Sequence, residues 1–326
     1  MKKGTGQVDT LAAWRRAIEE RLVALLPPGP DVMDGVAAAM RVAVLTPGKR
    51  VRPLLTLAIG RALGAREPAL LDLACAVELV HCASLVLDDM PAMDDARLRR
   101  GEPTVHLRFG EDVAMLAAVA LVSEACRVAA TARRLRGVAR ARSVEVLCEA
   151  IGPLGLVHGQ YRDLREGRAS RSVAAAAQAN DQKTGVLFAA ALELAACAAN
   201  RPDAMPMLRE AALAIGQAFQ LRDDLEDLQP SGTVPEDVLQ DAGKSTVLQL
   251  LGAAATHATV AAQLERARRA LHAVLGRDDP QLAALLRHAF PAADLADPAA
   301  QEDESPSFEP MPAWPLSAAT ALPLPG

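Results

Sequence analysis

Two groups of acidic residues carry the most chemical information in this chain. The first spans residues 88–95 and contains four aspartates; the second spans residues 223–227 and contains Asp223, Asp224 and Asp227. Each follows an apolar, helix-like stretch, and charged side chains at the end of such a stretch need a partner. Mg²⁺ takes oxygen ligands and often links one or two carboxylates to substrate phosphates. The two groups therefore point to a metal-bound phosphate or diphosphate as the ligand.

The spacing within each group determines how its carboxylates can be held. Asp223 and Asp227 are four residues apart and share one helix face, where a shared cation would remove their mutual repulsion. Asp88 and Asp94 are six apart with Pro91 between them, so a bulge or kink is expected there. A solvated acidic surface is the alternative for either group alone. Two such groups, each after an apolar helix and one leading directly into arginines, make that alternative the minor one.

Basic residues that could contact phosphate oxygens are clustered in two places. Lys49, Arg50 and Arg52 stand at a turn into an expected helix, and helix N-termini attract anions. Arg99 and Arg100 follow the first acidic group, and the arginine fork suits phosphate. The Arg99–Arg100 pair is the more specific of the two, because it adjoins a candidate metal site.

Three further motifs are weak on their own. Residues 183–185 read Lys-Thr-Gly, but the Ser-x-x-Lys motif that accompanies this triplet in acyl-transfer enzymes is not found. Residues 243–246 resemble the end of a P-loop, yet Val238 stands where glycine is required, so a Walker A site is rejected. A lone helical histidine is ordinarily a core or surface residue, but His81 lies two helical turns before Asp88 on the same face, which adds a diphosphate contact as an alternative.

The composition excludes several classes of protein. The chain has 326 residues, of which 51% are hydrophobic and 2% aromatic, and its net charge is -5. Scarce aromatic residues and the lack of a cationic surplus argue against nucleic-acid binding. The five cysteines form no C-x-x-C pair and lie in apolar stretches, which is typical of a reducing compartment. Because no apolar leader opens the chain and no apolar run reaches about 20 residues, we expect a cytoplasmic protein without a membrane span.

Helical periodicity dominates the chain as far as residue 275. Ala and Leu are frequent and nothing resembles a strand ladder, so the sequence predicts an all-α fold. The expected helices cover residues 9–26, 31–45, 51–63, 67–87, 112–133, 142–152, 153–166, 172–199, 206–227, 246–251 and 253–275. After Phe290 the composition shifts to Pro, Ala and acidic residues. This predicts one domain over residues 1–290 and a disordered tail over residues 291–326.

Together these motifs resemble those of the trans-isoprenyl diphosphate synthases. Residues 79–106, LVHCASLVLDDMPAMDDARLRRGEPTVH, resemble the first aspartate-rich region of that family, and residues 216–227, GQAFQLRDDLED, resemble the second. The remaining blocks of the family match, in the same order, GKRVRP at 48–53, HGQYRD at 158–163, KTG at 183–185 and DAGKST at 241–246. The greatest likeness is to bacterial geranylgeranyl diphosphate synthases of carotenoid-type pathways.

The resemblance implies a fold, a cofactor and an assembly. The family folds as a single-domain antiparallel helical bundle around a deep central cavity, usually as a homodimer. It joins isopentenyl diphosphate head to tail with allylic diphosphates (dimethylallyl, geranyl or farnesyl), and it depends on Mg²⁺, with three ions per active site when substrate is bound. The implied metal ligands are Asp88, Asp94, Asp223 and Asp227, with Asp89 and Asp224 as supporting catalytic residues.

The resemblance also divides the polar residues between two substrates. Contacts to isopentenyl diphosphate would come from Lys49, Arg52, His81 and Arg100. Contacts to the allylic diphosphate would come from Arg99, Lys183, Thr184, Gln220 and Lys244, with Lys183 also a catalytic residue. Metal ions and cations stabilise the charge that develops on the departing diphosphate. That diphosphate can accept the final proton, so no dedicated protein base is needed.

Small residues before the first acidic group bear on product length. Ala83 and Ser84 lie about one helical turn before Asp88, facing the expected cavity. In the family a bulky aromatic residue there stops growth at fifteen carbons, so the resemblance implies a twenty-carbon product, geranylgeranyl diphosphate. Synthases of farnesyl or geranylfarnesyl diphosphate are the alternatives. A terpene cyclase or a head-to-head synthase is less favoured, because Lys49, Arg52 and the Arg99–Arg100 pair suit isopentenyl diphosphate as acceptor. A non-catalytic partner subunit of a prenyl synthase is also less favoured, since such subunits typically lose one acidic group.

Overall fold

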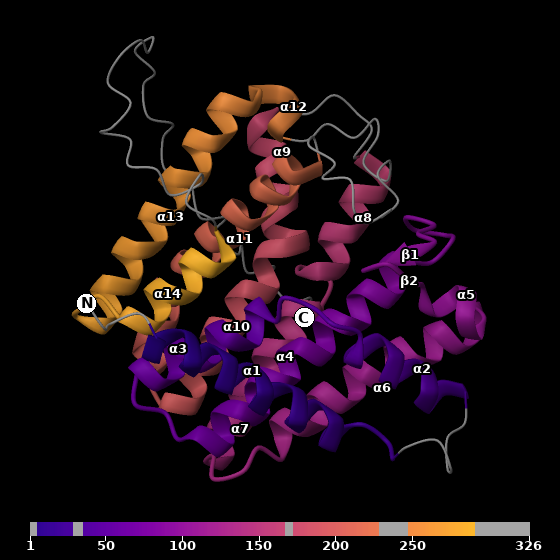
Figure 1. Ribbon diagram of the computed structural model, residues 1–326, viewed down its shortest axis with the longest axis horizontal. Helices are drawn as coiled ribbons and strands as arrows, with labels where there is room; N and C mark the ends of the chain where they lie inside the picture. Colours follow the sequence, from indigo (N-terminus) through magenta and orange to yellow (C-terminus); the bar gives the residue numbers. More distant parts are fainter. Residues whose placement is uncertain (1–4, 29–34, 167–171, 228–246, 291–326) are drawn as a thin grey trace, which may run out of the picture.

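The computed structural model describes residues 5–28, 35–166, 172–227 and 247–290. Within these ranges the chain is almost entirely helical, which confirms the all-α prediction (Figure 1). The helices are α1 (Thr5–Leu25), α2 (Gly35–Leu45), α3 (Val51–Ala62), α4 (Glu67–Asp88), α5 (Val105–Phe109), α6 (Glu111–Ala130), α7 (Gly137–Ile151), α8 (Leu156–Glu166), α9 (Val173–Asn180), α10 (Val186–Ala199), α11 (Met205–Asp227), α12 (Val247–Leu251), α13 (Ala253–Leu275) and α14 (Pro280–Ala289). A π-helical turn, η2 (Asp181–Gly185), and a 3₁₀ turn, η3 (Pro202–Ala204), complete them.

Helix α10 is the central element of the bundle. All eleven of its residues from Leu187 to Cys197 are buried, many of them alanines. It packs against α3, α4, α7 and α11, and α4 packs in turn against α3 and α6. Small side chains let these helices approach closely without leaving voids. The central helices therefore have little freedom to move, and the residues at their ends have fixed positions.

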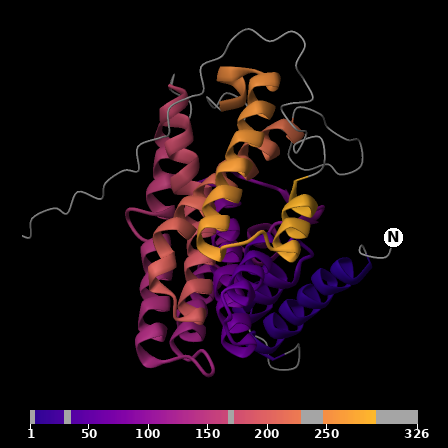
Figure 2. The same cartoon turned by 90° about the vertical axis from the view of Figure 1, so that its left-hand side faces the viewer.

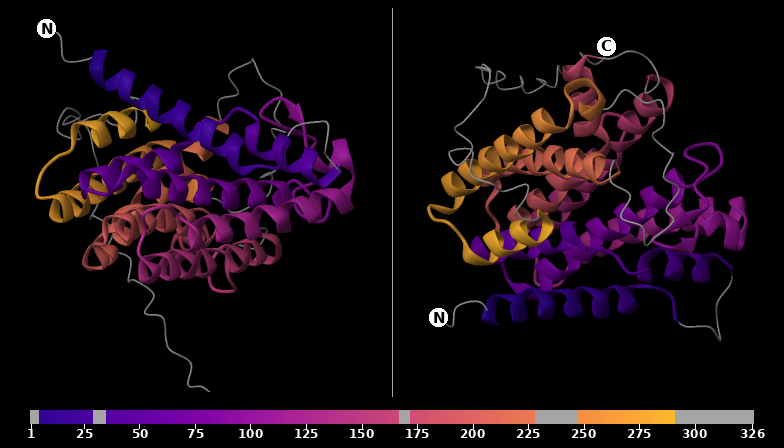
Figure 3. Two further views of the ribbon diagram at one scale, coloured as in Figure 1. Left: turned by 90° about the horizontal axis from the view of Figure 1, so that it is seen from below. Right: turned by 45° about the horizontal axis from the view of Figure 1, so that its top comes forward.

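The remaining helices enclose this centre. Short connections join α3 to α4, α6 to α7 and α10 to α11, and the helices of each pair pack together, as expected for antiparallel neighbours. Helix α13 packs along α11, and α14 packs against α1 and α3 (Figure 2). Helix α1 lies along the outside of the bundle (Figure 3).

Several features differ from the sequence prediction, among them the unpredicted short helix α5 and the start of α7 at Gly137 and not at residue 142. The single helix expected over residues 172–199 is divided into α9, η2 and α10. The expectation of no strands is corrected by a hairpin of two-residue strands, β1 (Leu98–Arg99) and β2 (Glu102–Pro103). The sequence prediction also omits α14, although Asp279 caps it by accepting hydrogen bonds from the amides of Gln281 and Leu282 (both 3.0 Å). The Asp279-Pro280 pair is a helix-start signal that could have revealed it.

Among the described residues, two helices, α4 and α6, are long and apolar enough to cross a membrane, judged by length and composition alone. In α4, 72% of the most apolar stretch of 18 residues is buried inside the bundle, as in the core helix of a soluble protein. In α6 the buried share is 39%, because one face of this helix lies on the surface. Two such helices are weak grounds for a membrane protein, and the burial of α4 explains its composition without one.

Candidate active site

The first acidic group lies where α4 ends. The helix stops at Asp88, and the chain turns back so that the amide of Asp94 donates to the carbonyl of Asp88 (3.0 Å). Asp95, in this turn, has a left-handed conformation (φ 50°). The expected kink between Asp88 and Asp94 is therefore a complete helix end, and the turn brings these two carboxylates close enough to repel each other.

The electrostatics at Asp88 favour a bound cation. Burial, together with the charge of Asp94, raises the pKa of the Asp88 carboxyl to about 6, against the opposing effect of Lys183. A carboxylate that has lost hydration and faces a second carboxylate is stabilised by any cation that reaches it. The position of Asp88 thus suits a metal ligand.

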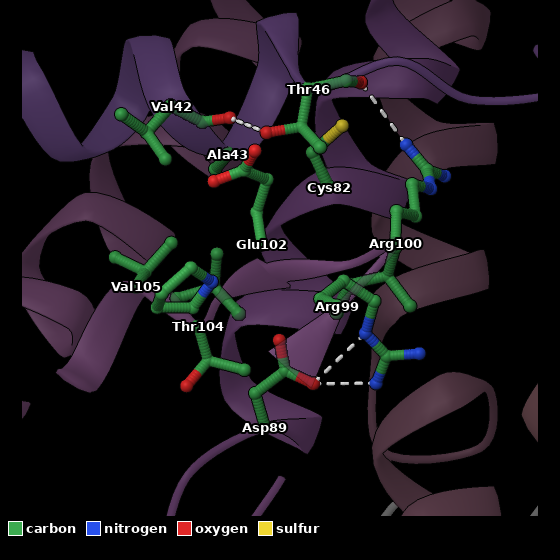
Figure 4. Close-up of a pocket in the computed structure, with 13 residues that line it drawn as sticks. Val42, Ala43, Thr46, Cys82, Asp89, Arg99, Arg100, Glu102, Thr104 and Val105 are labelled. Carbon is green, nitrogen blue, oxygen red and sulfur yellow. Dashed lines mark hydrogen bonds and ion pairs between the residues drawn. The ribbon is translucent and has the colours of Figure 1, made fainter. Parts of the chain in front are cut away.

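Asp89 has a different environment from Asp88. It is buried, and Arg99 donates to its Oδ1 through both Nε (3.0 Å) and Nη2 (2.5 Å). Figure 4 shows this pair on the wall of a pocket that also includes Cys82 and Arg100, formed by α2, α4 and the β1–β2 hairpin. Asp89 therefore anchors Arg99 beside the site, which agrees with a supporting role.

Arg100 is placed by the turn of the same hairpin. It has a left-handed conformation (φ 56°), and its Nη1 donates to the carbonyl of Thr46 (3.2 Å). The guanidinium covers Gly48, where an added Cβ would lie 2.3 Å from Nη1. Gly48 therefore leaves the space in which Arg100 reaches the turn before α3.

The first two cations of the turn before α3 have different roles. Arg50 is buried in a left-handed conformation (φ 51°) and binds Glu78 (Nη1 to Oε1, 2.7 Å) and Glu19 (Nε to Oε1, 2.8 Å). It fastens the turn to the protein interior. Lys49 is exposed instead, and its Nζ lies 3.7 Å from Oε2 of Glu226, in the second acidic group. Lys49, a predicted contact residue, thus faces the second acidic group, whereas Arg50 points into the protein interior.

Arg52 and His81 face each other, with Nη1 and Nε2 3.3 Å apart. The guanidinium of Arg52 also lies over the ring of Phe188, 4.4 Å from its centroid. Burial, with the charges of Arg52 and Arg100, lowers the pKa of His81 well below its ordinary value. The imidazole is therefore neutral, and its Nε2 can accept a hydrogen bond from Arg52.

The second acidic group occupies the last turns of α11. Asp224 is buried and accepts a hydrogen bond from Nε2 of Gln220 (2.9 Å), whose Oε1 accepts from the hydroxyl of Thr184 (2.9 Å). Burial raises the pKa of Asp223, while Arg222 opposes that effect by donating to its Oδ1 (2.6 Å). As in the first group, one aspartate is held inside and its neighbour lies beside the cations.

The π-turn η2 lies between the two acidic groups. A π-turn is a local widening of a helix and is frequent at functional sites. Lys183 in this turn donates to Asp163 of α8 (2.8 Å) and is close enough to Asp88 to lower its pKa. Thr184, the next residue, begins the hydrogen-bond chain to the second group. The structure thus brings the first group, Lys183–Thr184 and the second group to one region.

The other predicted residues are placed less completely. Asp227 is the last residue of α11, and its side chain lies outside the described part of the chain, as do all atoms of Lys244. Ala83 is buried in α4, and the hydroxyl of Ser84 donates to the carbonyl of His81 (2.8 Å).

Sequence reasoning gave no role to three charged residues of this region, Asp163, Arg222 and Glu226. Asp163 partners Lys183, Arg222 partners Asp223, and Glu226 faces Lys49. The signal for Arg222 is its position directly after the apolar run that ends at Leu221, where a charge must be buried or paired. Asp163 and Glu226 stand inside matched motifs but carry no distinctive spacing.

The donor set fits Mg²⁺ that is bound only in part by protein. Among the residues that the structure describes, no three His, Cys, Asp or Glu side chains converge as a metal cage. Each acidic group offers one or two carboxylates instead. Mg²⁺ usually keeps several waters and takes substrate phosphate oxygens beside one or two carboxylates, so this arrangement suits it.

Comparisons with known proteins agree with this geometry. A family model described as polyprenyl synthetase matches residues 34–284. A geranylgeranyl diphosphate synthase of Pantoea ananas is 49% identical over 260 residues, 78% of this chain and 85% of the relative. Another, from Pseudescherichia vulneris, is 46% identical over 273 residues (83% and 88%). The solved apo structure of an FPP/GFPP synthase from Zymomonas mobilis covers 87% of this chain and 99% of its own, with a TM-score of 0.77 and 30% identity.

The helical bundle with two acidic groups at its helix ends defines an all-α isoprenoid synthase. The chain belongs to the polyprenyl synthetase family, and within it the chain is a trans-prenyltransferase. The family in general uses Mg²⁺. The resemblance drawn from the motifs is confirmed.

The contact between α8 and η2 gives a first prediction. A Cβ added at Gly159 would lie 2.5 Å from the backbone at Gln182 and Lys183, whereas one added at Gly137 meets nothing within 4 Å. We expect Gly159→Ala to destabilise the protein by about 1–3 kcal/mol, because the backbone of η2 must move. Gly137→Ala should be neutral or slightly stabilising, since alanine favours helix. Urea unfolding of both variants tests this, and equal unfolding midpoints would contradict it.

Proposed function

We propose that this enzyme condenses isopentenyl diphosphate head to tail with allylic diphosphates, with Mg²⁺, to give geranylgeranyl diphosphate. The observation that carries the proposal is the meeting of two acidic groups, from α4 and α11, around Lys183 and Thr184. Two relatives that are 49% and 46% identical bear that enzyme name, which supports the assignment. Residues 1–290 form the catalytic domain in this proposal. The predicted tail, residues 291–326, lies outside the described residues.

The acidic residues divide into metal ligands and supports. In the proposal Asp88 and Asp94 would hold Mg²⁺ at one helix end, and Asp223 with Asp227 would hold it at the other, with three ions expected in the substrate complex. Bound Mg²⁺ supplies neutralisation of the charge that develops on the leaving diphosphate. Asp89 holds Arg99 in place and Asp224 holds Gln220 in place. These hydrogen bonds support the roles of Arg99 and Gln220 as contacts to the allylic diphosphate.

The cations divide between the two substrates. Lys49, Arg52, His81 and Arg100 bind isopentenyl diphosphate, and the neutral ring of His81 also orients Arg52. The allylic diphosphate is bound by Arg99, Lys183, Thr184, Gln220 and Lys244. The hydrogen bonds of Lys183 to Asp163 and of Thr184 to Gln220 preorganise this set before substrate arrives.

The reaction then needs no protein base. The bond between C1 of the allylic substrate and its diphosphate oxygen breaks, and both electrons leave with the diphosphate. The double bond of isopentenyl diphosphate attacks C1 and forms the new carbon–carbon bond. The proton lost from C2 of the isopentenyl unit passes to the released diphosphate, which restores a double bond. Buried apolar helices around the site exclude water from the cationic carbon.

The product assay tests the function directly. Purified enzyme with farnesyl diphosphate, isopentenyl diphosphate and Mg²⁺ should give the twenty-carbon diphosphate as its main product, identified by chromatography and mass. Farnesyl diphosphate left unextended would show either a synthase that stops at fifteen carbons or a non-catalytic partner subunit. A twenty-five-carbon product would favour the activity named for the Zymomonas mobilis relative. Activity in excess chelator without added metal would contradict the role of Mg²⁺.

Product length is proposed to depend on small residues in the last turns of α4. Ala83 is 1% exposed and Ser84 9%, so a larger side chain at either position would have to extend away from α4 into neighbouring space. We expect Ala83→Tyr to shorten the main product from twenty carbons to fifteen, because the ring blocks the path of the growing chain. Ser84→Ala, which keeps the residue small, should leave the product unchanged. An Ala83→Tyr enzyme that still makes the twenty-carbon product would place the end of the cavity elsewhere.

The assembly is proposed to be a cytoplasmic homodimer in which a second copy covers the outer face of α6. Met115, Leu116 and Val119 are 49%, 56% and 68% exposed there, an apolar face that a partner would bury. Sedimentation should give twice the chain mass of 34.2 kDa. Val119→Asp should shift the protein toward monomer, while the same change at Val23, an exposed position of α1, should not. A monomeric wild-type protein would refute the dimer.

A further inference from the structure

Arg222 is a buried charge at the second acidic group that the proposed mechanism does not use. Its side chain is only 4% exposed. Nη2 donates to Oδ1 of Asp223 (2.6 Å), Nη1 donates to the carbonyl of Ala289 at the end of α14, and Nε lies 3.2 Å from Oε1 of Glu226. The guanidinium therefore joins the acidic end of α11 to the last turn of α14.

Two aromatic rings lie close to the same guanidinium. Its central carbon lies 4.7 Å from the centroid of Phe219 and 5.7 Å from that of Phe290. The two rings are themselves in edge contact, with centroids 6.4 Å apart and planes at 86°. A planar cation held by rings and by directed hydrogen bonds has few alternative orientations, so its contact with Asp223 is fixed.

The contact with Asp223 uses one oxygen of a carboxylate that has two. An ionised carboxylate offers about four acceptor positions, so an Nη2–Oδ1 bond leaves Oδ2 able to bind a cation. Groups that hydrogen-bond to a metal ligand fix its orientation, and their loss typically costs about 10–100-fold in metal affinity. Arg222 has the position of such a group, because it adjoins Asp223 in sequence and is anchored on α14 rather than on solvent.

We propose that Arg222 is a positioning residue that orients Asp223 for Mg²⁺ and ties this ligand to the end of α14. The inference rests on the proposed function, in which Asp223 is a metal ligand. In this proposal the position of α14 affects the orientation of Asp223, although α14 itself supplies no metal ligand. Arg222 acts through Asp223, and it touches neither diphosphate.

A second arginine of α11 provides a matched control. Arg209 binds Glu193 through Nε (2.6 Å) and Nη2 (3.0 Å), so it too is the cation of an ion pair in which one partner is buried. It lies thirteen residues before Arg222, roughly 20 Å along the helix at 1.5 Å per residue. A loss of stability alone should therefore be common to both substitutions, whereas an effect on the metal should be confined to Arg222.

The experiment measures Mg²⁺ binding without turnover. The full chain is titrated with Mg²⁺ at a fixed saturating bisphosphonate, a non-reacting stand-in for diphosphate, and the thermal shift gives the Mg²⁺ midpoint. We expect Arg222→Met to raise this midpoint about 10–100-fold. Arg209→Met should lower the melting temperature but keep the midpoint of the wild type. Should Arg222→Met fail to fold, Arg222→Lys, which keeps the charge but loses the fork, should still raise the midpoint.

A double-mutant cycle separates positioning from general damage. Asp223→Asn should itself raise the Mg²⁺ midpoint, and adding Arg222→Met to it should change little more, because the two act as one unit. Full additivity would overturn the proposal. A midpoint in Arg222→Met equal to that of the wild type would overturn it as well, and a lower midpoint would show that Arg222 competes with the metal. A wild-type protein without any Mg²⁺-dependent shift would instead overturn the proposed function.

Discussion

The structure depends on the cost of removing carboxylates from water at the ends of two apolar helices. Burial raises the pKa of Asp88, Asp89 and Asp223, which means that each ionised side chain lacks full compensation by solvent. Cations offset the cost at each position, Lys183 and Arg99 at the first group and the adjacent Arg222 at the second. At the first group these cations come from η2 and β1, so both elements must meet the end of α4, whereas at the second group the cation is supplied by α11 itself.

Much of this could be predicted from the sequence. Long helices with 3.6-residue periodicity, two acidic groups and the order of the motifs together predicted the fold class and the family. The sequence did not predict how Asp88 and Asp94 meet, because the turn between them is determined by backbone conformation, with a left-handed Asp95. It also missed the β1–β2 hairpin, whose strands of two residues are too short to show any alternation.

Other features of the site depend on long-range contacts that no local pattern encodes. Arg50 and Arg52 stand two residues apart in one basic turn, yet Arg50 binds Glu19 and Glu78 in the interior while Arg52 meets His81. Three of the five phenylalanines lie in one row of contacting side chains. In order, the row contains Arg52, Phe188, Phe219, Arg222 and Phe290. This row joins the cation beside His81 to the second acidic group. The few aromatic residues of the chain are thus concentrated beside the arginines that they orient.

The π-turn η2 limits how this chain can diverge. A π-turn takes about one residue more than an α-helical turn, so loss of a single residue between Asp181 and Gly185 would leave α9 and α10 in register as one continuous helix. The cost would fall on the widened turn itself, because Lys183 and Thr184 would lose the positions from which they reach Asp163 and Gln220. The extra residue therefore serves the site and not the packing of the bundle, and descendants of this sequence could lose it only together with those two contacts.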